Sequence, residues 1–349
     1  MMSTVIAETV GKAGIITLNR PQAMNALTLE MVREMAACLQ AWRTDDNVAL
    51  VIVRGAGERG LCAGGDVVGL YHDAQARGTE GATFWAEEYQ LNLDIAQYPK
   101  PYVALQTGIV LGGGIGISAH GSHRIVTDST RVGMPETGIG FVPDVGGTYL
   151  LARAADNLGV HLALTGAHVG AAEAIACGLS DVYVPEDRLD PLVEALCETG
   201  DPGVIDNYAQ SVPEGFAAER ADMSRIYAAD SVEQILERLD AEEADWAADA
   251  ARRIRRNCPL ALKVTLESVR LARGQSLAEA LDTEFRVSNN MQRGTEFIEG
   301  VRAQLVDKDR SPKWNPATLE EVTPEAVAAM FGPIEDPRIA DINLASKEQ

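Results

Sequence analysis

The sequence predicts an α/β fold with stacked layers of strands and helices, followed by a helical C-terminal region. Short apolar runs alternate with amphipathic helical stretches from Val5 to Pro185, a pattern typical of stacked β and α layers. From Pro259 to about Asp307, apolar residues recur only at helical spacing. The composition, 46% hydrophobic and 23% charged over 349 residues, is that of a globular protein with one large domain or two ordinary ones.

Each expected strand is a short apolar run bounded by turn residues, and the first two strands form a hairpin around a glycine-containing turn. The expected strands are residues 5–10, 15–19, 48–53, 102–106, 124–128 and 182–185. Each expected helix carries apolar residues at helical spacing. The expected helices of this part are residues 27–42, 79–97, 115–120, 150–158, 161–166 and 171–178.

The composition changes near residue 200. Residues 201–250 hold thirteen acids against three arginines, with helical periodicity from Val232 to Leu239, which predicts a solvated, linker-like acidic connection. Beyond Pro312 the prolines and polar residues predict an extended tail, with residues 342–349 disordered. The predicted organisation is a core (1–200), an acidic helical connection (201–250), a C-terminal helical region (251–330) and a tail (331–349).

Charge and cysteine usage exclude several classes of function. A net charge of −21 and a pI near 4.6 disfavour nucleic-acid and anionic-membrane partners, because most of this surface would repel phosphate. No apolar run approaches the ~20 residues that span a bilayer. The start, Met1 to Glu8, has no targeting pattern, so we expect a cytoplasmic protein. The five scattered cysteines form no CxxC pair and predict buried thiols, with neither a disulfide framework nor a metal site.

Residues 134–147 place two carboxylates, Glu136 and Asp144, among apolar residues and glycines. Carboxyl groups in such surroundings tend to have raised pKa values. Upstream, the glycine run Gly112–Gly114 can leave backbone N–H groups bare to hold an oxyanion. These are the groups that acyl chemistry needs, although surface N-cap or turn carboxylates would give the same pattern.

A second glycine-rich segment, Gly64–Gly65–Asp66, follows a strand and precedes a helical stretch, where its amides can contact an oxyanion or a phosphate. Residues 114–119 also satisfy the dinucleotide pattern G-x-G-x-x-A. Only about ten residues remain before the next strand, which is short for the crossover of a nucleotide-binding unit. We therefore favour the amides of Gly65 and Gly113 as oxyanion donors. Glu88 is a weaker candidate, because an acid in a helix is usually solvated.

Several motifs together resemble the crotonase (enoyl-CoA hydratase/isomerase) superfamily, and within it the branch that hydrolyses 3-hydroxyisobutyryl-CoA. The resemblance covers about residues 5–330, and its later motifs are specific to the hydrolase branch. The segments that carry it are residues 19–21, 25–27, 62–66, 112–114, 134–136, 143–147, 259–265, 299–303, 307–309 and 311–314.

The resemblance implies a crotonase-like spiral of ββα turns and an acyl-CoA thioester as substrate, held by an oxyanion hole at the amides of Gly65 and Gly113. Glu136 matches the later of two glutamates that hydratases of the family carry, and the earlier one falls at Gly116. Where hydratases tend to have glycine, this chain has Asp144, as the hydrolase branch does. Glu88 resembles a substrate-contacting glutamate of that branch.

The function that we expect is hydrolysis of a short 3-hydroxyacyl-CoA, foremost 3-hydroxyisobutyryl-CoA in valine breakdown. Glu136 and Asp144 would be catalytic, and Glu88, Gly64 and Asp66 would bind substrate. No cofactor is expected beyond the coenzyme A of the substrate, and whether the chain forms a homo-oligomer is left open. The alternatives are an enoyl-CoA hydratase or isomerase, an NAD-binding oxidoreductase, and a non-catalytic CoA-binding protein. Also open are the catalytic route, an anhydride or an activated water, and whether Lys263 or the arginines at 252–256 meet the CoA phosphates.

Overall fold

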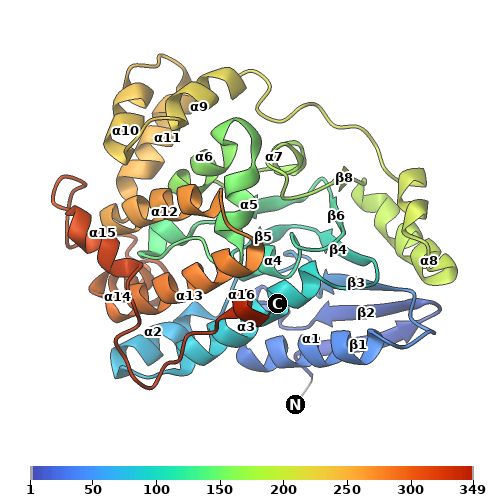
Figure 1. The fold of residues 1–349 in the computed structure, drawn as a ribbon. Helices are drawn as coiled ribbons and strands as arrows, with labels where there is room; N and C mark the ends of the chain where they lie inside the picture. The colour runs from blue at the N-terminus through green and yellow to red at the C-terminus, as the bar shows by residue number, and fades with distance from the viewer. Residues whose placement is uncertain (1–2, 348–349) are drawn as a thin grey trace. The chain divides into compact units, whose positions relative to one another are not determined.

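The structure, a computed structural model, describes residues 3–347 (Figure 1). These residues divide into two compact units. Unit 1 comprises residues 3–65, 87–133 and 169–215; unit 2 comprises residues 66–86, 134–168 and 216–347. Each unit is therefore assembled from three separate segments of the chain. The boundaries at residues 200, 250 and 330, which the composition suggests, stay a prediction.

Unit 1 is built on a six-stranded sheet in the order β1-β2-β3-β4-β6-β8. β1 and β2 form the predicted antiparallel hairpin, and the other neighbouring pairs are parallel. A second, two-stranded parallel sheet pairs β5 with β7. The strands are β1 (Val5–Val10), β2 (Ala13–Leu18), β3 (Leu50–Gly55), β4 (Tyr102–Gln106), β5 (Ile109–Leu111), β6 (His123–Val126), β7 (Arg131–Gly133) and β8 (Val182–Tyr183).

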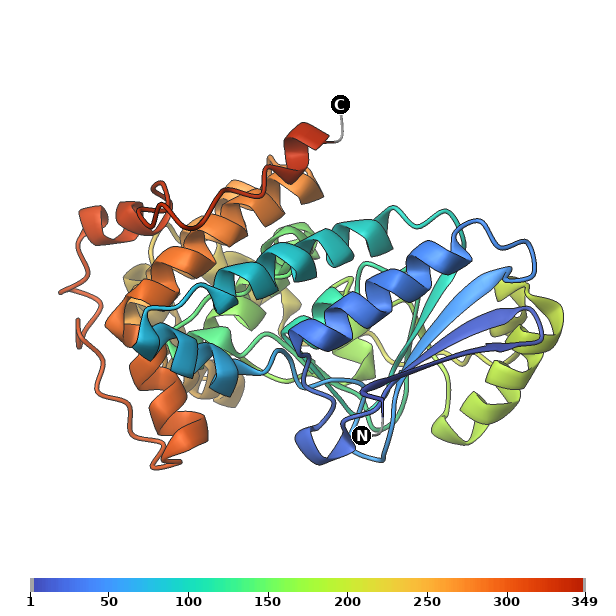
Figure 2. The same cartoon turned by 90° about the horizontal axis from the view of Figure 1, so that it is seen from below.

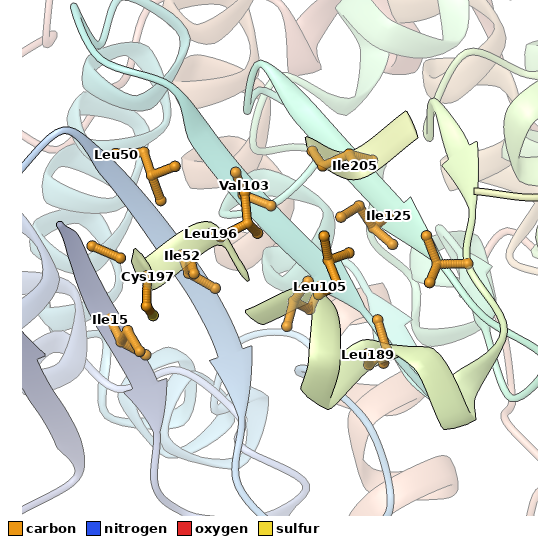
Figure 3. Packing of buried hydrophobic residues seen from close by; sticks show 13 residues of the cluster. Ile15, Leu50, Ile52, Val103, Leu105, Ile125, Leu189, Leu196, Cys197 and Ile205 are labelled. Carbon is orange, nitrogen blue, oxygen red and sulfur yellow. The ribbon is translucent and has the colours of Figure 1, made fainter. Parts of the chain in front are cut away.

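The larger sheet is buried on both faces along its inner strands β2, β3 and β4. Side chains alternate along a strand, so Ile15 of β2 points to one face while position 14 points to the other. On the first face Ile15, Ile52 and Leu105 pack with α8 (Leu189–Thr199), in the cluster that Figure 3 shows. On the other face a Cβ at Gly14 would lie 2.6 Å from the Trp42 ring of α1 (Leu29–Trp42), which runs along β1 and β2 (Figure 2).

The chain moves repeatedly from the larger sheet to the smaller one. β4 continues directly into β5, and β6 into β7, so each pass adds one strand to both sheets. Cys62 joins the same arrangement through a parallel bridge to Val110 of β5. These passes bring Cys62–Gly65, Leu111–Gly113 and β7 together at one place in unit 1.

The remaining helices of unit 1 lie between these strands or follow β8. They are η1 (Pro21–Ala23), α4 (Gly113–Gly116), α7 (Ala171–Ala176), η4 (Glu186–Arg188) and η5 (Pro202–Asn207). The boundary between the units falls within α3 (Glu80–Ala96), of which residues 87–96 belong to unit 1. The predicted helix at residues 115–120 is wrong in its bounds, because α4 has only four residues and begins at Gly113.

Unit 2 is helical. Its elements are α2 (Val67–Ala76), η2 (Glu136–Ile139), α5 (Gly147–Arg153), η3 (Ala155–Asn157), α6 (Leu158–Thr165), α9 (Arg220–Tyr227), α10 (Val232–Asp240), α11 (Asp245–Arg256), α12 (Pro259–Ala272), α13 (Leu277–Arg293), α14 (Thr295–Val301), the π-helix η6 (Arg302–Val306), α15 (Pro324–Met330) and α16 (Leu344–Lys347). The helical C-terminal region predicted from Pro259 onward is confirmed.

The acidic segment 201–250 is helical as predicted, but it is not a solvated linker. Within unit 2, α9, α10 and α11 each bury an apolar face, through Ile226, Ile235 and Ile254 among others. The acids occupy the opposite faces, where Asp240 and Asp249 pair with arginines of α11. High net charge was misleading here because amphipathic helices can concentrate charge on one face and still pack.

The predicted disorder of residues 342–349 is also wrong within the described residues. Leu344–Lys347 form α16, the Leu344 side chain is buried, and the Leu344 and Ala345 amides donate to the Asp282 carboxylate. Residues 348–349 and Met1–Met2, on which parts of the tail and targeting predictions fall, lie outside the described residues. None of the helices within residues 3–347 combines the length and apolar character that crossing a bilayer needs.

Candidate functional site

Unit 1 brings Gly65, Glu88 and Gly113 together. A Cβ placed on Gly113 would lie 2.7 Å from the Glu88 Oε1 and 3.3 Å from the Gly65 nitrogen. Gly113 begins α4, where backbone N–H groups have no helical acceptor. Within residues 3–347, neither the Gly65 nor the Gly113 N–H donates a hydrogen bond. The two predicted oxyanion donors are therefore neighbours with unused N–H groups.

Local backbone geometry explains why this place is rich in glycine. Gly64 has φ 107° and Gly112 has φ 47°, backbone conformations that residues other than glycine rarely adopt. The Leu27 amide donates to the Gly64 carbonyl at 2.8 Å, and the Gly112 amide donates to the Gly133 carbonyl at 3.3 Å. These bonds tie Gly64 to the segment that precedes α1, and Gly112 to β7.

Glu88 is buried, although its sequence neighbour Glu87 is not. Glu87 forms a two-pronged ion pair with Arg33 at the surface, which holds the Glu87 pKa below its usual range. Glu88 lies on the other side of α3 and is only 2% exposed. The interpretation of Glu88 as a solvated helix acid is therefore wrong, and the helix presents its carboxylate to Gly113.

In unit 2, Glu136 is a buried carboxyl group at the start of η2. It is 7% exposed, and its Oε2 has no hydrogen-bond partner among the residues that the structure describes. Burial raises the Glu136 pKa well above its ordinary value, and the nearby carboxylates of Asp144 and Glu284 raise it further. The alternative of a surface turn carboxylate is excluded for Glu136.

Neighbouring helices fix the turn that carries Glu136. The Cys258 amide donates to the Thr137 carbonyl, and the Asn257 side chain donates to the Thr137 hydroxyl, each at 3.0 Å. Gly140 ends η2 with φ 70°, and a Cβ there would lie 2.2 Å from the Glu296 carbonyl oxygen of α14. Only glycine allows this close approach, so the position of Glu136 depends on α14.

Asp144 is also buried, at 6% exposure, and it lies near Glu136 and Glu284. Glu284, on α13, accepts hydrogen bonds from the Gly146 amide (2.6 Å) and the Thr148 amide (2.9 Å). Burial raises the Glu284 pKa to about 8, although the Thr148 hydroxyl and these amides favour its charged form and Asp144 opposes it. Glu136, Asp144 and Glu284 are thus buried carboxyl groups that lie near one another in unit 2.

Sequence reasoning missed Glu284 and Thr148. A signal for Glu284 was present, because it lies at helical spacing from Leu277, Leu281 and Ser288, on the buried face of α13. An acid on an apolar helix face has to be paired, hydrogen-bonded or neutral. Its hydrogen-bond partners lie more than 130 residues earlier in the chain, so no local sequence pattern could indicate them.

A family model described as "Enoyl-CoA hydratase/isomerase" matches residues 13–331. The chain belongs to this family. Curated relatives named "3-hydroxyisobutyryl-CoA hydrolase, mitochondrial" are 39% identical: the Danio rerio protein over 96% of this chain and 91% of its own length, and the Homo sapiens protein over 92% and 86%. The resemblance that the sequence motifs indicated is confirmed.

Solved structures of the family confirm the crotonase-like α/β fold. A carnitinyl-CoA dehydratase from Mycobacterium thermoresistibile is 49% identical with a TM-score of 0.93, over 96% of this chain and 98% of its own. An enoyl-CoA hydratase from Rhodobacter sphaeroides is 42% identical with a TM-score of 0.89, over 95% and 98%. The passes between two sheets in unit 1 are the predicted ββα turns of this fold.

The same fold excludes the dinucleotide alternative. Nucleotide-binding sheets bind their ligand where the strand order reverses, and the six-stranded sheet here runs in chain order without reversal. The glycine pattern at residues 114–119 is followed by no crossover helix, because α4 ends at Gly116. Among residues 3–347, no cluster of three or more His, Cys, Asp or Glu is arranged to hold a metal ion.

The other family residues predicted to bind substrate have visible structural partners. Asp66 caps α2 by accepting from the Gly69 amide at 3.5 Å. Lys263 pairs with Glu233 at 2.7 Å, in a groove of about 700 Å³ between α10, α12 and α15. The arginines of α11 pair with Asp240 and Asp249. Substrate binding by Asp66 stays a prediction, and whether Lys263 or the arginines meet the CoA phosphates stays open.

Proposed function

We propose that this chain hydrolyses a short 3-hydroxyacyl-CoA, foremost 3-hydroxyisobutyryl-CoA, to coenzyme A and the free 3-hydroxy acid, a step of valine breakdown. The observation that carries the proposal is the buried pair of Glu136 and Asp144, in which one Glu136 oxygen has no partner among the described residues. Relatives 39% identical over most of the chain bear the corresponding name. The reaction needs no cofactor beyond the coenzyme A of the substrate.

In the proposed reaction, Glu136 acts on the thioester carbonyl carbon by one of two routes. In the first, its carboxylate attacks the carbon, the C–S bond breaks, the CoA thiolate leaves and takes up a proton, and water then hydrolyses the anhydride. In the second, Glu136 removes a proton from a water that attacks the carbon directly, the C–S bond breaks, and the CoA thiolate leaves and takes up that proton. Asp144 orients Glu136 or exchanges a proton with it. A buried carboxylate with little solvation is suited to either task.

The N–H groups of Gly65 and Gly113 are proposed to hold the thioester oxygen as it becomes negative. One such donor typically contributes ~3 kcal/mol to transition-state stabilisation. Glu88, beside Gly113, is proposed to accept a hydrogen bond from the substrate 3-hydroxyl, with Gly64 and Asp66 near the bound thioester. A buried carboxylate that needs a donor discriminates strongly against an acyl group without a hydroxyl.

Hydration of an enoyl-CoA is the second candidate, because the two solved structures with 42–49% identity bear hydratase and dehydratase titles. Hydratases of the family carry two catalytic glutamates, and the position of the earlier one is Gly116 here. Gly116 is buried in α4 and has no side chain to transfer a proton. This favours hydrolysis.

The deciding experiment offers the purified protein a panel of acyl-CoA thioesters. Release of free CoA is followed with a thiol-reactive dye, and hydration is followed by the loss of enoyl-thioester absorbance. We expect CoA release from 3-hydroxyisobutyryl-CoA, with slower release from isobutyryl-CoA, which lacks the hydroxyl. Absorbance loss from an enoyl-CoA without thiol release would instead establish the hydratase, and no CoA from any 3-hydroxyacyl-CoA would reject the hydrolase.

A further inference from the structure

Glu284 is an acid on the buried face of α13. Its side chain is 2% exposed, and Leu281 and Phe285 beside it are buried. A carboxyl group is kept in such a place only when hydrogen bonds compensate its lost hydration. The hydrogen-bond donors to Glu284 identify the segment of chain that this carboxyl group holds in place.

Among residues 3–347, the hydrogen-bond donors to Glu284 all come from residues 146–148. The Gly146 amide donates to Oε2 at 2.6 Å, and the Thr148 amide and hydroxyl donate to Oε1 at 2.9 and 2.5 Å. One carboxyl group therefore fixes the chain that directly follows Asp144.

The backbone after Asp144 needs this support. Val145 has φ 56° and Gly146 has φ 75°, so two consecutive residues are left-handed, and one of them is β-branched. The Gly147 amide closes the turn onto the Asp144 carbonyl at 2.6 Å. A strained conformation persists only when its surroundings determine it, and Glu284 supplies the bonds from outside the turn.

The ionisable groups that face Glu284 are carboxyl groups. Asp144 raises the Glu284 pKa, and both Asp144 and Glu284 raise the Glu136 pKa. Four titratable side chains on the elements packed against α13 and η2 bond to other groups. Arg153 of α5 donates to the carbonyls of Ala272 and Gln275, Lys263 of α12 pairs with Glu233, His161 of α6 bonds the Tyr227 hydroxyl, and Glu296 of α14 accepts from the Asn315 amide.

We propose that Glu284 is a positioning residue for the reaction, whose carboxyl group holds the turn after Asp144 and thereby keeps Asp144 beside Glu136. This inference rests on the proposed function, because it assigns Glu284 a part in the chemistry of the Glu136–Asp144 pair. Glu284 itself touches no reacting atom in this assignment.

The test compares Glu284→Gln with Glu279→Gln. Glu279 is an acid on the same helix, but it is exposed and forms the capping box with Ser276. An amide in place of the Glu284 carboxylate loses one acceptor oxygen and keeps the side-chain shape. Misplacing a catalytic group typically costs about tenfold to a hundredfold in rate, so we expect kcat of Glu284→Gln to fall by that factor with KM within about twofold. Glu279→Gln should retain the wild-type kcat.

The pH profile separates positioning from a structural role. Glu284→Gln removes a carboxyl group that raises the Glu136 pKa, so the acidic limb of the kcat profile should move to lower pH. A general loss of folding would lower kcat at every pH and leave the pH of the acidic limb unchanged. An unchanged kcat, or a lowered kcat with an unmoved limb, would overturn the proposal.

Thr148 gives a second variant in case Glu284→Gln does not fold. Thr148→Val removes one of the three hydrogen bonds and Thr148→Ser keeps it, so kcat should fall several-fold in the first and return to the wild-type value in the second. Equal kcat in both variants would count against positioning.

A readout without substrate keeps this inference apart from the proposed function. The Glu136 carboxyl carbon, assigned by its absence in Glu136→Gln, is titrated by ¹³C NMR. We expect a lower midpoint in Glu284→Gln than in the wild type, whether or not the wild type hydrolyses any thioester. An equal midpoint would reject the inference, whereas a wild type without thioesterase activity would reject the proposed function alone.

Discussion

The residues proposed for chemistry are held in close contact, so at the scale of single residues an added methyl group is an informative probe. Gly113→Ala would place a Cβ 2.7 Å from the Glu88 Oε1 and 3.3 Å from the Gly65 nitrogen. Displacing one oxyanion donor typically costs about 10²–10³ in kcat, and we expect a loss of this order in CoA release. Gly274→Ala is the control, because a Cβ there meets nothing within 4 Å. Similar kcat values for the two variants would remove Gly113 from the site.

Asp144 is the residue that separates the hydrolase prediction from the hydratase one. Family hydratases tend to have glycine at this position. The substitution Asp144→Gly should lower the rate of CoA release by about a hundredfold if Asp144 shares in proton transfer. Asp222→Asn, at an exposed ion pair of α9, should change nothing. Thiol release at saturating substrate is the measurement, and an unaffected rate in Asp144→Gly would take Asp144 out of the mechanism.

At the scale of elements, η2 depends on a close approach to α14. Gly140→Ala combines a left-handed φ of 70° with a Cβ 2.2 Å from the Glu296 carbonyl. Gly178 has the same φ of 70° with nothing within 4 Å, so Gly178→Ala carries the conformational cost alone, about 1–2 kcal/mol. We expect Gly140→Ala to lose more free energy of unfolding than Gly178→Ala. We also expect kcat to fall in Gly140→Ala. Equal losses of unfolding free energy in denaturant titrations would show that α14 moves to accommodate the added Cβ with no further loss of stability.

The helices and strands also show where sequence patterns succeed and fail. Amphipathic periodicity predicted α3 closely and the helical region from Pro259 onward, because a buried stripe is a local feature of the sequence. The three-residue strands β5 and β7 were missed, since so short a strand is defined only by its partner. Acidic content over residues 201–250 suggested a linker, yet α9, α10 and α11 bury faces that composition cannot reveal.

At the scale of the whole molecule, buried titratable groups set the dependence of stability on pH. Burial lowers the His161 pKa to about 4, from an ordinary value of 6.5. Below pH 6.5 the histidine of the unfolded chain binds a proton, whereas His161 of the folded chain stays neutral until about pH 4. The free energy of unfolding therefore decreases as pH falls from 6.5 to about 4. The raised pKa values of Glu136 and Glu284 act in the opposite sense, because the folded chain keeps protons that the unfolded chain releases as pH rises above about 4.5.

His161→Gln isolates the histidine contribution. Between pH 7 and pH 5, the wild type should lose about 2 kcal/mol of unfolding free energy relative to this variant, from 1.5 pH units at 1.36 kcal/mol each. His72→Gln, at an exposed position, should follow the wild type at both pH values. A difference between wild type and His161→Gln that stays constant with pH would contradict the buried, neutral assignment.

The sequence by itself determined the α/β class, the family, and the choice of Gly65, Gly113, Glu136 and Asp144 as candidate site residues. Glycine runs and acids among apolar residues are local patterns, so they can be recognised without the structure. Only the tertiary structure decided which acids are buried. Glu87 and Glu88 are adjacent in sequence, yet one forms a surface ion pair and the other lies beside Gly113. Glu284 supports the turn after Asp144 across 138 residues of chain. Burial and hydrogen-bond partners arise from packing between distant segments, and no local pattern encodes them.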